Sequence, residues 1–190
     1  MTEKKNINFT KRILGIDPGS IITGYGVIDY DGNKMTLVEY GVISAAKKEE
    51  TFPLRLKAIY ERLSQVVERT LPDESAFEAI FFGKNVQSMM KLSHARAAAM
   101  LAVTMREIPI AEYAPREVKK SVTGLGNAGK EQVQFMVKKL MSIQEDHQFL
   151  DATDALSIAI CHCLRSGIRR NSNKSWESFI KNNPDRIKSS

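Results

Sequence analysis

The chain has 190 residues, a formal net charge of +6 and 43% hydrophobic residues. That length predicts one α/β domain with a single core. No run approaches the roughly 20 apolar residues of a membrane span, and the polar first residues lack an apolar signal core, so we expect a cytoplasmic protein without a membrane partner. Cys161 and Cys163 are the only cysteines. Two positions apart on a predicted helix, they indicate neither a disulfide nor a zinc site.

Residues 1–11 are polar and predict a flexible N-terminal extension. The apolar run 13–16 predicts a buried strand that ends at Asp17, because a Pro-Gly turn follows. A carboxylate at the end of a buried strand is costly without a cation, and the nearby sequence offers none. Two explanations stay open. Asp17 caps the turn, or it faces a metal ion or phosphate in open space left by Gly24 and Gly26.

The remaining elements follow from periodicity and turn residues. An Asp-Gly-Asn turn predicts that the first three strands form an antiparallel meander. A later helix with an Ala- and Met-rich face suits either the sheet or a subunit interface. In chain order we expect strands at 24–30 and 35–43, a helix from Pro53 to Val67, a strand at 76–82, the Ala- and Met-rich helix at 86–104, a strand at 108–113, and helices at 115–123, 130–141 and 151–164.

Three more acids stand where acids are unusual. Glu78 falls in the middle of the apolar run 76–82, which indicates either an exposed edge position or a functional carboxylate. Asp151 and Asp154 are three residues apart, which places them on one face of a helix. The helix dipole alone could explain two acids in a first turn.

The four acids, Asp17, Glu78, Asp151 and Asp154, converge if the first and fourth strands are neighbours and the last helix crosses them. Clustered carboxylates repel one another unless a cation compensates. Oxygen ligands without His or Cys favour Mg²⁺ or Mn²⁺. Two such ions about 3.5–4 Å apart can activate a water and stabilise the leaving oxygen of a phosphodiester.

Basic charge is concentrated in two segments, 116–139 and 166–190, each with a net charge of +4. We expect the second segment to be a flexible C-terminal tail behind a domain spanning residues 12–165. Basic segments around an acidic centre are typical of a surface that binds a polyanion, although a solvated lysine-rich face is the simpler alternative. Together with the acids, they predict a nuclease.

Four motifs occur in order: ILGIDPGSIITGYGVI, AFEAIFFGKN, EYAPREVKKSVTGLGNAGKEQV and DATDALSIAICH. They resemble the RuvC family of crossover (Holliday) junction endodeoxyribonucleases over residues 13–164. The resemblance implies an RNase H-like fold with a mixed five-stranded sheet flanked by helices. It also implies a homodimer that makes paired symmetric nicks in four-way DNA junctions during recombination and repair. The implied cofactor is Mg²⁺, two ions per subunit, with Mn²⁺ able to substitute, and the implied partners are the branch-migration proteins RuvA and RuvB.

The resemblance also implies roles for individual residues. The motif positions of the catalytic and metal-binding acids are Asp17, Glu78, Asp151 and Asp154, with Asp17 as the bridging ligand. The implied DNA-binding residues are Phe81, Lys84, Lys119 and Lys130. The helical stretch 89–99 falls where the family's subunits meet. Two positions depart from the family pattern, because Ala79 replaces a Gln and Gly83 replaces an Ala; both affect the loop after Glu78 and remove no ligand.

Three other functions compete with this one. The GIDPG segment also resembles the phosphate loop of actin-like and sugar-kinase ATPases, but these need a second domain to close over the nucleotide. A non-catalytic junction-binding protein explains the basic segments and leaves four acids without a purpose. A more general RNase H-like nuclease is the nearest rival, because it would use the same acids on other nucleic acids.

Overall fold

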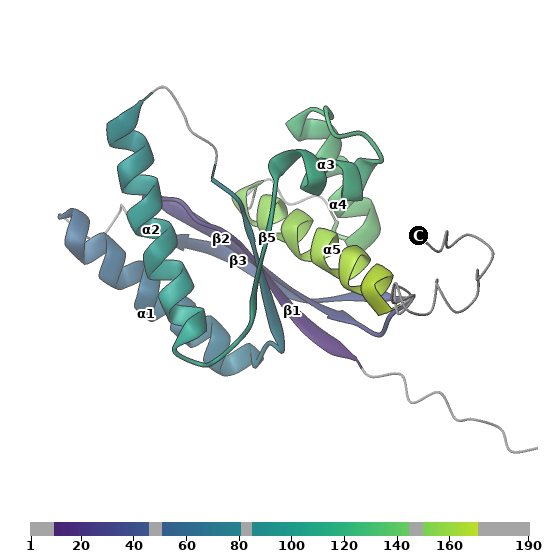
Figure 1. Ribbon diagram of the computed structural model, residues 1–190, viewed down its shortest axis with the longest axis horizontal. Coiled ribbons are helices and arrows are strands. Elements are labelled where there is room, and N and C mark those ends of the chain that lie inside the picture. The colour runs from purple at the N-terminus through teal and green to yellow at the C-terminus, as the bar shows by residue number, and fades with distance from the viewer. Residues whose placement is uncertain (1–9, 46–50, 81–84, 145–149, 171–190) are drawn as a thin grey trace, which may run out of the picture.

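The computed structural model describes residues 10–45, 51–80, 85–144 and 150–170. Within these residues the centre of the molecule is a five-stranded sheet in the order β3-β2-β1-β4-β5 (Figure 1). This confirms the expected α/β class and mixed sheet. The elements are β1 (Lys11–Asp17), β2 (Ile22–Tyr30), β3 (Met35–Ser44), α1 (Phe52–Thr70), β4 (Glu74–Glu78), α2 (Val86–Thr104), β5 (Ile110–Tyr113), α3 (Pro115–Thr123), α4 (Lys130–Met141) and α5 (Leu150–Arg170).

The first three strands form the predicted antiparallel meander, and β4 and β5 add to it in parallel with β1. The first and fourth strands are therefore neighbours, as the convergence of the acids requires. Because parallel strands point the same way, the carboxyl ends of β1, β4 and β5 meet at one edge of the sheet. The last side chains of these three strands therefore lie close together at that edge.

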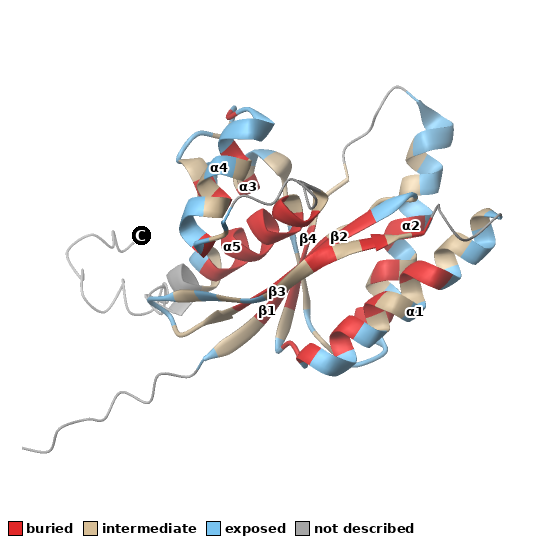
Figure 2. Cartoon of the chain, turned by 180° about the vertical axis from the view of Figure 1, so that it is seen from behind, coloured by how far each residue is buried: buried red, intermediate tan, exposed pale blue. Residues whose placement is uncertain are grey.

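Helices cover both faces of the sheet, with α1 and α2 on one and α3, α4 and α5 on the other (Figures 1 and 2). Alternation along β1 divides its side chains between the two cores. Leu14 and Ile16 join the core beneath α1 and α2, whereas Ile13 joins the core with α4 and α5. The two cysteines of α5 likewise belong to different clusters. No helix of the described residues is long and apolar enough to span a membrane.

Several predicted strand boundaries were wrong, and those of the fourth and fifth strands differ at the active-site edge. The fourth strand was expected at 76–82 but begins at Glu74 and ends at Glu78, so Glu78 lies at the strand end and not in its middle. Its neighbours set this limit, because β1 stops at Asp17 and β5 stops at Tyr113. The fifth strand was expected from residue 108 but begins at Ile110.

The last helix is longer than predicted and continues from residue 164 to Arg170. Arg165 holds this extra turn against α3 through an ion pair of 2.9 Å with Glu117. Its guanidinium also lies over the ring of Tyr113, 5.9 Å from the centroid. Residues 166–170 were expected as the start of the tail, but they belong to this helix. Residues 171–190 lie outside the described part of the chain.

Candidate active site

Two of the four predicted acids end neighbouring parallel strands. Asp17 is the last residue of β1, and Glu78 is the last residue of β4. The residues that precede them are partners in the ladder, so the two acids stand next to each other at one edge of the sheet. Asp151 and Asp154 lie in the first two turns of α5, which packs across β1 and β2. The fold thus brings acids from three distant parts of the chain to the same edge.

Asp17 interacts electrostatically with the other three acids. Burial is the main cause that raises the pKa of Asp17 to about 7. The negative charges of Asp154, Glu78 and Asp151 raise that pKa further, and the positive charge of Lys130 lowers it by a smaller amount. A carboxyl group with a pKa near neutrality loses its proton reluctantly, so this position favours an added cation.

Negative and positive neighbours act in opposite directions on the pKa of Glu78. Burial raises the pKa of the Glu78 carboxyl, and the charge of Asp154 raises it further. The positive charges of Lys119 and Arg96 act in the opposite direction. Lys119 lies on α3, and the family resemblance implies a role for it in DNA binding. The structure brings it within electrostatic reach of an acid 41 positions earlier in the chain.

Lys130 contacts the acid cluster directly. It is the first residue of α4, and its Nζ lies 2.7 Å from Oδ2 of Asp154. Burial raises the pKa of Asp154, and the bond from Lys130 opposes that rise. The same bond raises the pKa of Lys130, so the lysine stays protonated. In the metal-free protein this ammonium group supplies part of the positive charge that the acids require.

A cavity of about 150 Å³ opens beside Asp17 and Glu78, and Ile80, Leu92 and Arg96 complete part of its wall. Within the described residues, no three His, Cys, Asp or Glu side chains are close enough to hold a metal ion as they stand. The acids therefore interact over some distance and do not form a closed ligand set. The chemistry of the donors nevertheless fits a hard divalent cation, since all four are carboxylates.

The space next to Gly24 and Gly26 is not open, which corrects the expectation that it would suit a metal ion or phosphate. A Cβ added to Gly24 would lie 2.2 Å from the backbone oxygen of Asp151. One added to Gly26 would lie 2.6 Å from Cδ2 of Leu156. Helix α5 fills this space, so the glycines let the helix approach the sheet.

Sequence reasoning overlooked Arg96, which lines the cavity from α2. The available signal was a charged residue inside an Ala- and Met-rich helical stretch that otherwise predicts a buried face. Two predicted DNA-binding residues, Phe81 and Lys84, lie outside the described residues.

The geometry agrees with the family that the motifs indicated. Residues 13–162 match the family model described as crossover junction endodeoxyribonuclease RuvC. The chain belongs to the RuvC family. The RuvC of Cytophaga hutchinsonii is 48% identical over 176 residues, which cover 93% of this chain and 88% of that protein. The RuvC of Geobacter sulfurreducens is 49% identical over 151 residues, covering 80% of this chain and 91% of that protein.

Solved structures of RuvC have the same architecture. Thermus thermophilus RuvC in complex with Holliday junction substrate superposes with a TM-score of 0.77 at 30% identity, covering 83% of this chain and 96% of that one. The yeast mitochondrial Holliday junction resolvase Ydc2 gives a TM-score of 0.64 at 15% identity, covering 89% of this chain and 85% of that one; this likeness shows the fold alone. The fold is the expected RNase H-like fold of these resolvases.

Proposed function

We propose that this protein is a Holliday junction resolvase, an endonuclease that makes paired symmetric nicks in four-way DNA junctions during recombination and repair. The observation that carries the proposal is the meeting of Asp17, Glu78 and the two α5 acids at one edge of an RNase H-like sheet. Membership of the RuvC family supplies the substrate. Because the proposed substrate is DNA inside the cell, we propose a cytoplasmic location.

The four acids would hold Mg²⁺, two ions per subunit, and Mn²⁺ would substitute for it. Bound there, the ions would supply Lewis-acid stabilisation of the charge that develops on the phosphodiester. Asp17 would be the central, bridging ligand, which its electrostatic interactions with Glu78, Asp151 and Asp154 support. The raised pKa of Asp17 supports this, since a cation would favour the ionised form.

The basic residues around the acids would hold the DNA. Lys119 approaches Glu78, and Lys130 pairs with Asp154, so both ammonium groups lie where a phosphate next to the acids would be neutralised. From the family motif we also assign a DNA-binding role to Phe81 and Lys84.

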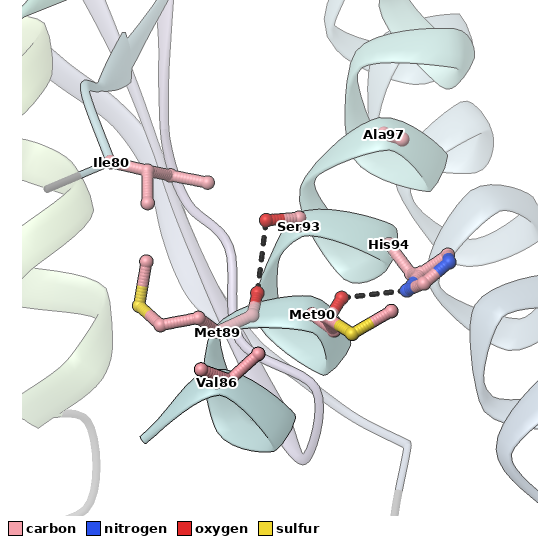
Figure 3. A pocket seen from close by; sticks show the side chains of 7 residues that line it. All are labelled: Ile80, Val86, Met89, Met90, Ser93, His94 and Ala97. Atoms are coloured by element: carbon pink, nitrogen blue, oxygen red, sulfur yellow. Dashed lines mark hydrogen bonds between the residues drawn. The ribbon is translucent and has the colours of Figure 1, made fainter. Parts of the chain in front are cut away.

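The exposed apolar face at the start of α2 supports a homodimer. A groove of about 780 Å³ lies there, lined by Met89, Met90 and their neighbours (Figure 3). Val86 is 69% exposed and Met90 is 56% exposed, which is unfavourable for apolar side chains in water. A two-fold dimer presents two active sites to the two strands of a two-fold junction. RuvA and RuvB would present the junction to this dimer.

The test is cleavage of a synthetic four-way DNA junction in Mg²⁺ and in EDTA, with linear duplex as the control substrate. Wild type is compared with Asp17→Asn. We expect symmetric paired nicks from the wild type in Mg²⁺ only, and none from the variant, because the variant lacks the central carboxylate.

Other outcomes of this experiment would support one of the competing functions. Equal cutting of linear duplex would indicate a general RNase H-like nuclease. Junction binding without cutting in any divalent metal would indicate a binding protein. Hydrolysis of ATP by the chain alone would indicate the ATPase alternative.

A further inference from the structure

Arg96 is a buried cation in the middle of α2. It is 7% exposed and stands next to Ala95, which is completely buried. Removing a guanidinium group from water costs several kcal/mol unless close partners compensate. The partners of Arg96 therefore decide what this residue does.

The three partners of Arg96 among the described residues lie on the strands that end at the active site. Its Nη1 donates a hydrogen bond to the backbone oxygen of Glu78. Its Nη2 lies 2.8 Å from Oε2 of Glu112 on β5, an ion pair without the angles of a hydrogen bond. Its guanidinium carbon lies 5.3 Å from the ring centroid of Phe77, a cation–π contact.

The bond to Glu78 fixes one particular peptide group. That peptide joins Glu78 to Ala79, and its N–H donates to the backbone oxygen of Tyr113 at 2.8 Å. Its carbonyl accepts from Arg96. The peptide plane is thus held from both sides at the point where β4 ends, which fixes the backbone angle ψ of Glu78 and limits the rotamers open to its side chain.

We propose that Arg96 is a positioning residue for the cleavage reaction. It holds the Glu78–Ala79 peptide so that the Glu78 carboxylate faces the cavity lined by Asp17, and it does not itself contact the substrate. The inference rests on the proposed function, because Glu78 is taken to be a metal ligand. Residues that orient metal ligands commonly change metal affinity or activity by about 10–100-fold when they are mutated.

An arginine suits this role better than a lysine. The planar guanidinium group presents donors in a fixed fork, so one side chain reaches the Glu78 carbonyl and Glu112 at the same time. A lysine would keep the charge and reach one acceptor. The pair Arg96→Lys and Arg96→Met therefore separates loss of the fork from loss of the charge.

The experiment compares these variants with wild type and with Arg106→Met as a matched control. Arg106 pairs with the exposed Glu68, and neither residue lines the cavity beside Asp17. Four quantities are measured: melting temperature in EDTA, Mn²⁺ binding to the DNA-free protein by electron paramagnetic resonance, junction affinity in EDTA, and single-turnover cleavage rate at saturating enzyme and metal.

We expect Arg96→Met to weaken Mn²⁺ binding and to slow cleavage by about 10–100-fold each, with junction affinity unchanged. Arg96→Lys should lie between Arg96→Met and wild type, and the control should match wild type. Glu112→Gln should weaken Mn²⁺ binding less than Arg96→Met does, because it removes the charge opposite Arg96 and leaves the Arg96–Glu78 bond in place.

A lower melting temperature with normal Mn²⁺ binding and normal cleavage would overturn the proposal, since Arg96 would then only stabilise the fold. Weaker junction binding with normal Mn²⁺ binding would also overturn it, because Arg96 would then contact DNA. If Arg96→Met does not fold, the same measurements on Arg96→Lys test the proposal, and the same results would overturn it. If wild type cleaves nothing, the proposed function fails together with any role of Arg96 in cleavage, and the Mn²⁺ comparison then tests only whether Arg96 positions Glu78.

Discussion

The side chain of Asp17 is buried among other negative charges. Its pKa is raised from 3.8 to about 7, so between these pH values the folded state binds more protons than the unfolded state. The contribution of Asp17 to the free energy of unfolding of the metal-free protein therefore falls as the pH rises from about 4 to about 7. Above that range the full cost of ionising Asp17 is present.

Asp17→Asn removes this cost and keeps the shape of the side chain. We expect the metal-free variant to be more stable than wild type at pH 8, by at most about 4 kcal/mol, and equally stable at pH 4. Urea unfolding in EDTA at both pH values measures the difference. A variant that is less stable than wild type at pH 8 would contradict the acid cluster.

Asp31→Asn is the control with the opposite sign. The Asp31 carboxylate accepts hydrogen bonds from the backbone N–H groups of Lys34 at 2.7 Å and Asn33 at 2.9 Å. These bonds lower the pKa of Asp31, so its ionised form stabilises the fold. Asp31→Asn should therefore reduce the stability at pH 8, which separates a specific effect at Asp17 from a general effect of removing negative charge.

At the scale of elements, the position of α5 on the sheet decides where its two acids lie. A Cβ on Gly24 would stand 2.2 Å from a backbone oxygen of Asp151. Because this is a contact between two backbone segments, relieving it requires β2 or α5 to move. We expect Gly24→Ala to destabilise the protein by about 1–3 kcal/mol and to displace the first turn of α5. Mn²⁺ binding to the DNA-free protein should weaken as a result.

Gly41→Ala is the matched control for this prediction. Its added Cβ would lie 2.7 Å from the hydroxyl oxygen of Tyr25, a side-chain clash on β3 that does not involve α5. Both variants should lose stability in urea unfolding, and only Gly24→Ala should lose Mn²⁺ affinity. Equal Mn²⁺ affinity in the two variants would show that the contact between α5 and β2 does not position the acids.

At the scale of the whole molecule, paired cutting depends on two subunits. The apolar face at the start of α2 is the proposed interface, and Met90 is 56% exposed on it. We expect Met90→Glu to give a monomer, because a dimer would bury the new charge. Light scattering after gel filtration measures the mass, and junction cleavage should change from paired to single nicks.

Met105→Glu is the control for the dimer. Met105 is 64% exposed, at the other end of α2, and does not line the groove of Figure 3. This variant should remain a dimer and make paired nicks. A dimeric Met90→Glu would place the subunit interface on another surface.

The sequence by itself determined the local elements, and it predicted the chemistry. The Asp-Gly-Asn turn predicted the meander of β1, β2 and β3, and the apolar stripe after Pro53 predicted α1. These features depend on neighbours a few residues away, so periodicity and turn residues suffice. The four acids were also identified from the sequence, and their catalytic role stays a prediction that the Asp17→Asn experiment tests.

Only the tertiary structure decided how these acids are surrounded. Strand β4 ends at Glu78 because both neighbouring strands stop there, and the space beside Gly24 is closed because a helix more than 120 residues later packs against it. The contacts of Lys130 with Asp154 and of Arg96 with the Glu78 carbonyl also depend on how helices pack against the sheet. Contacts between residues far apart in the chain depend on how strands and helices pack, and local propensities carry no information about that packing.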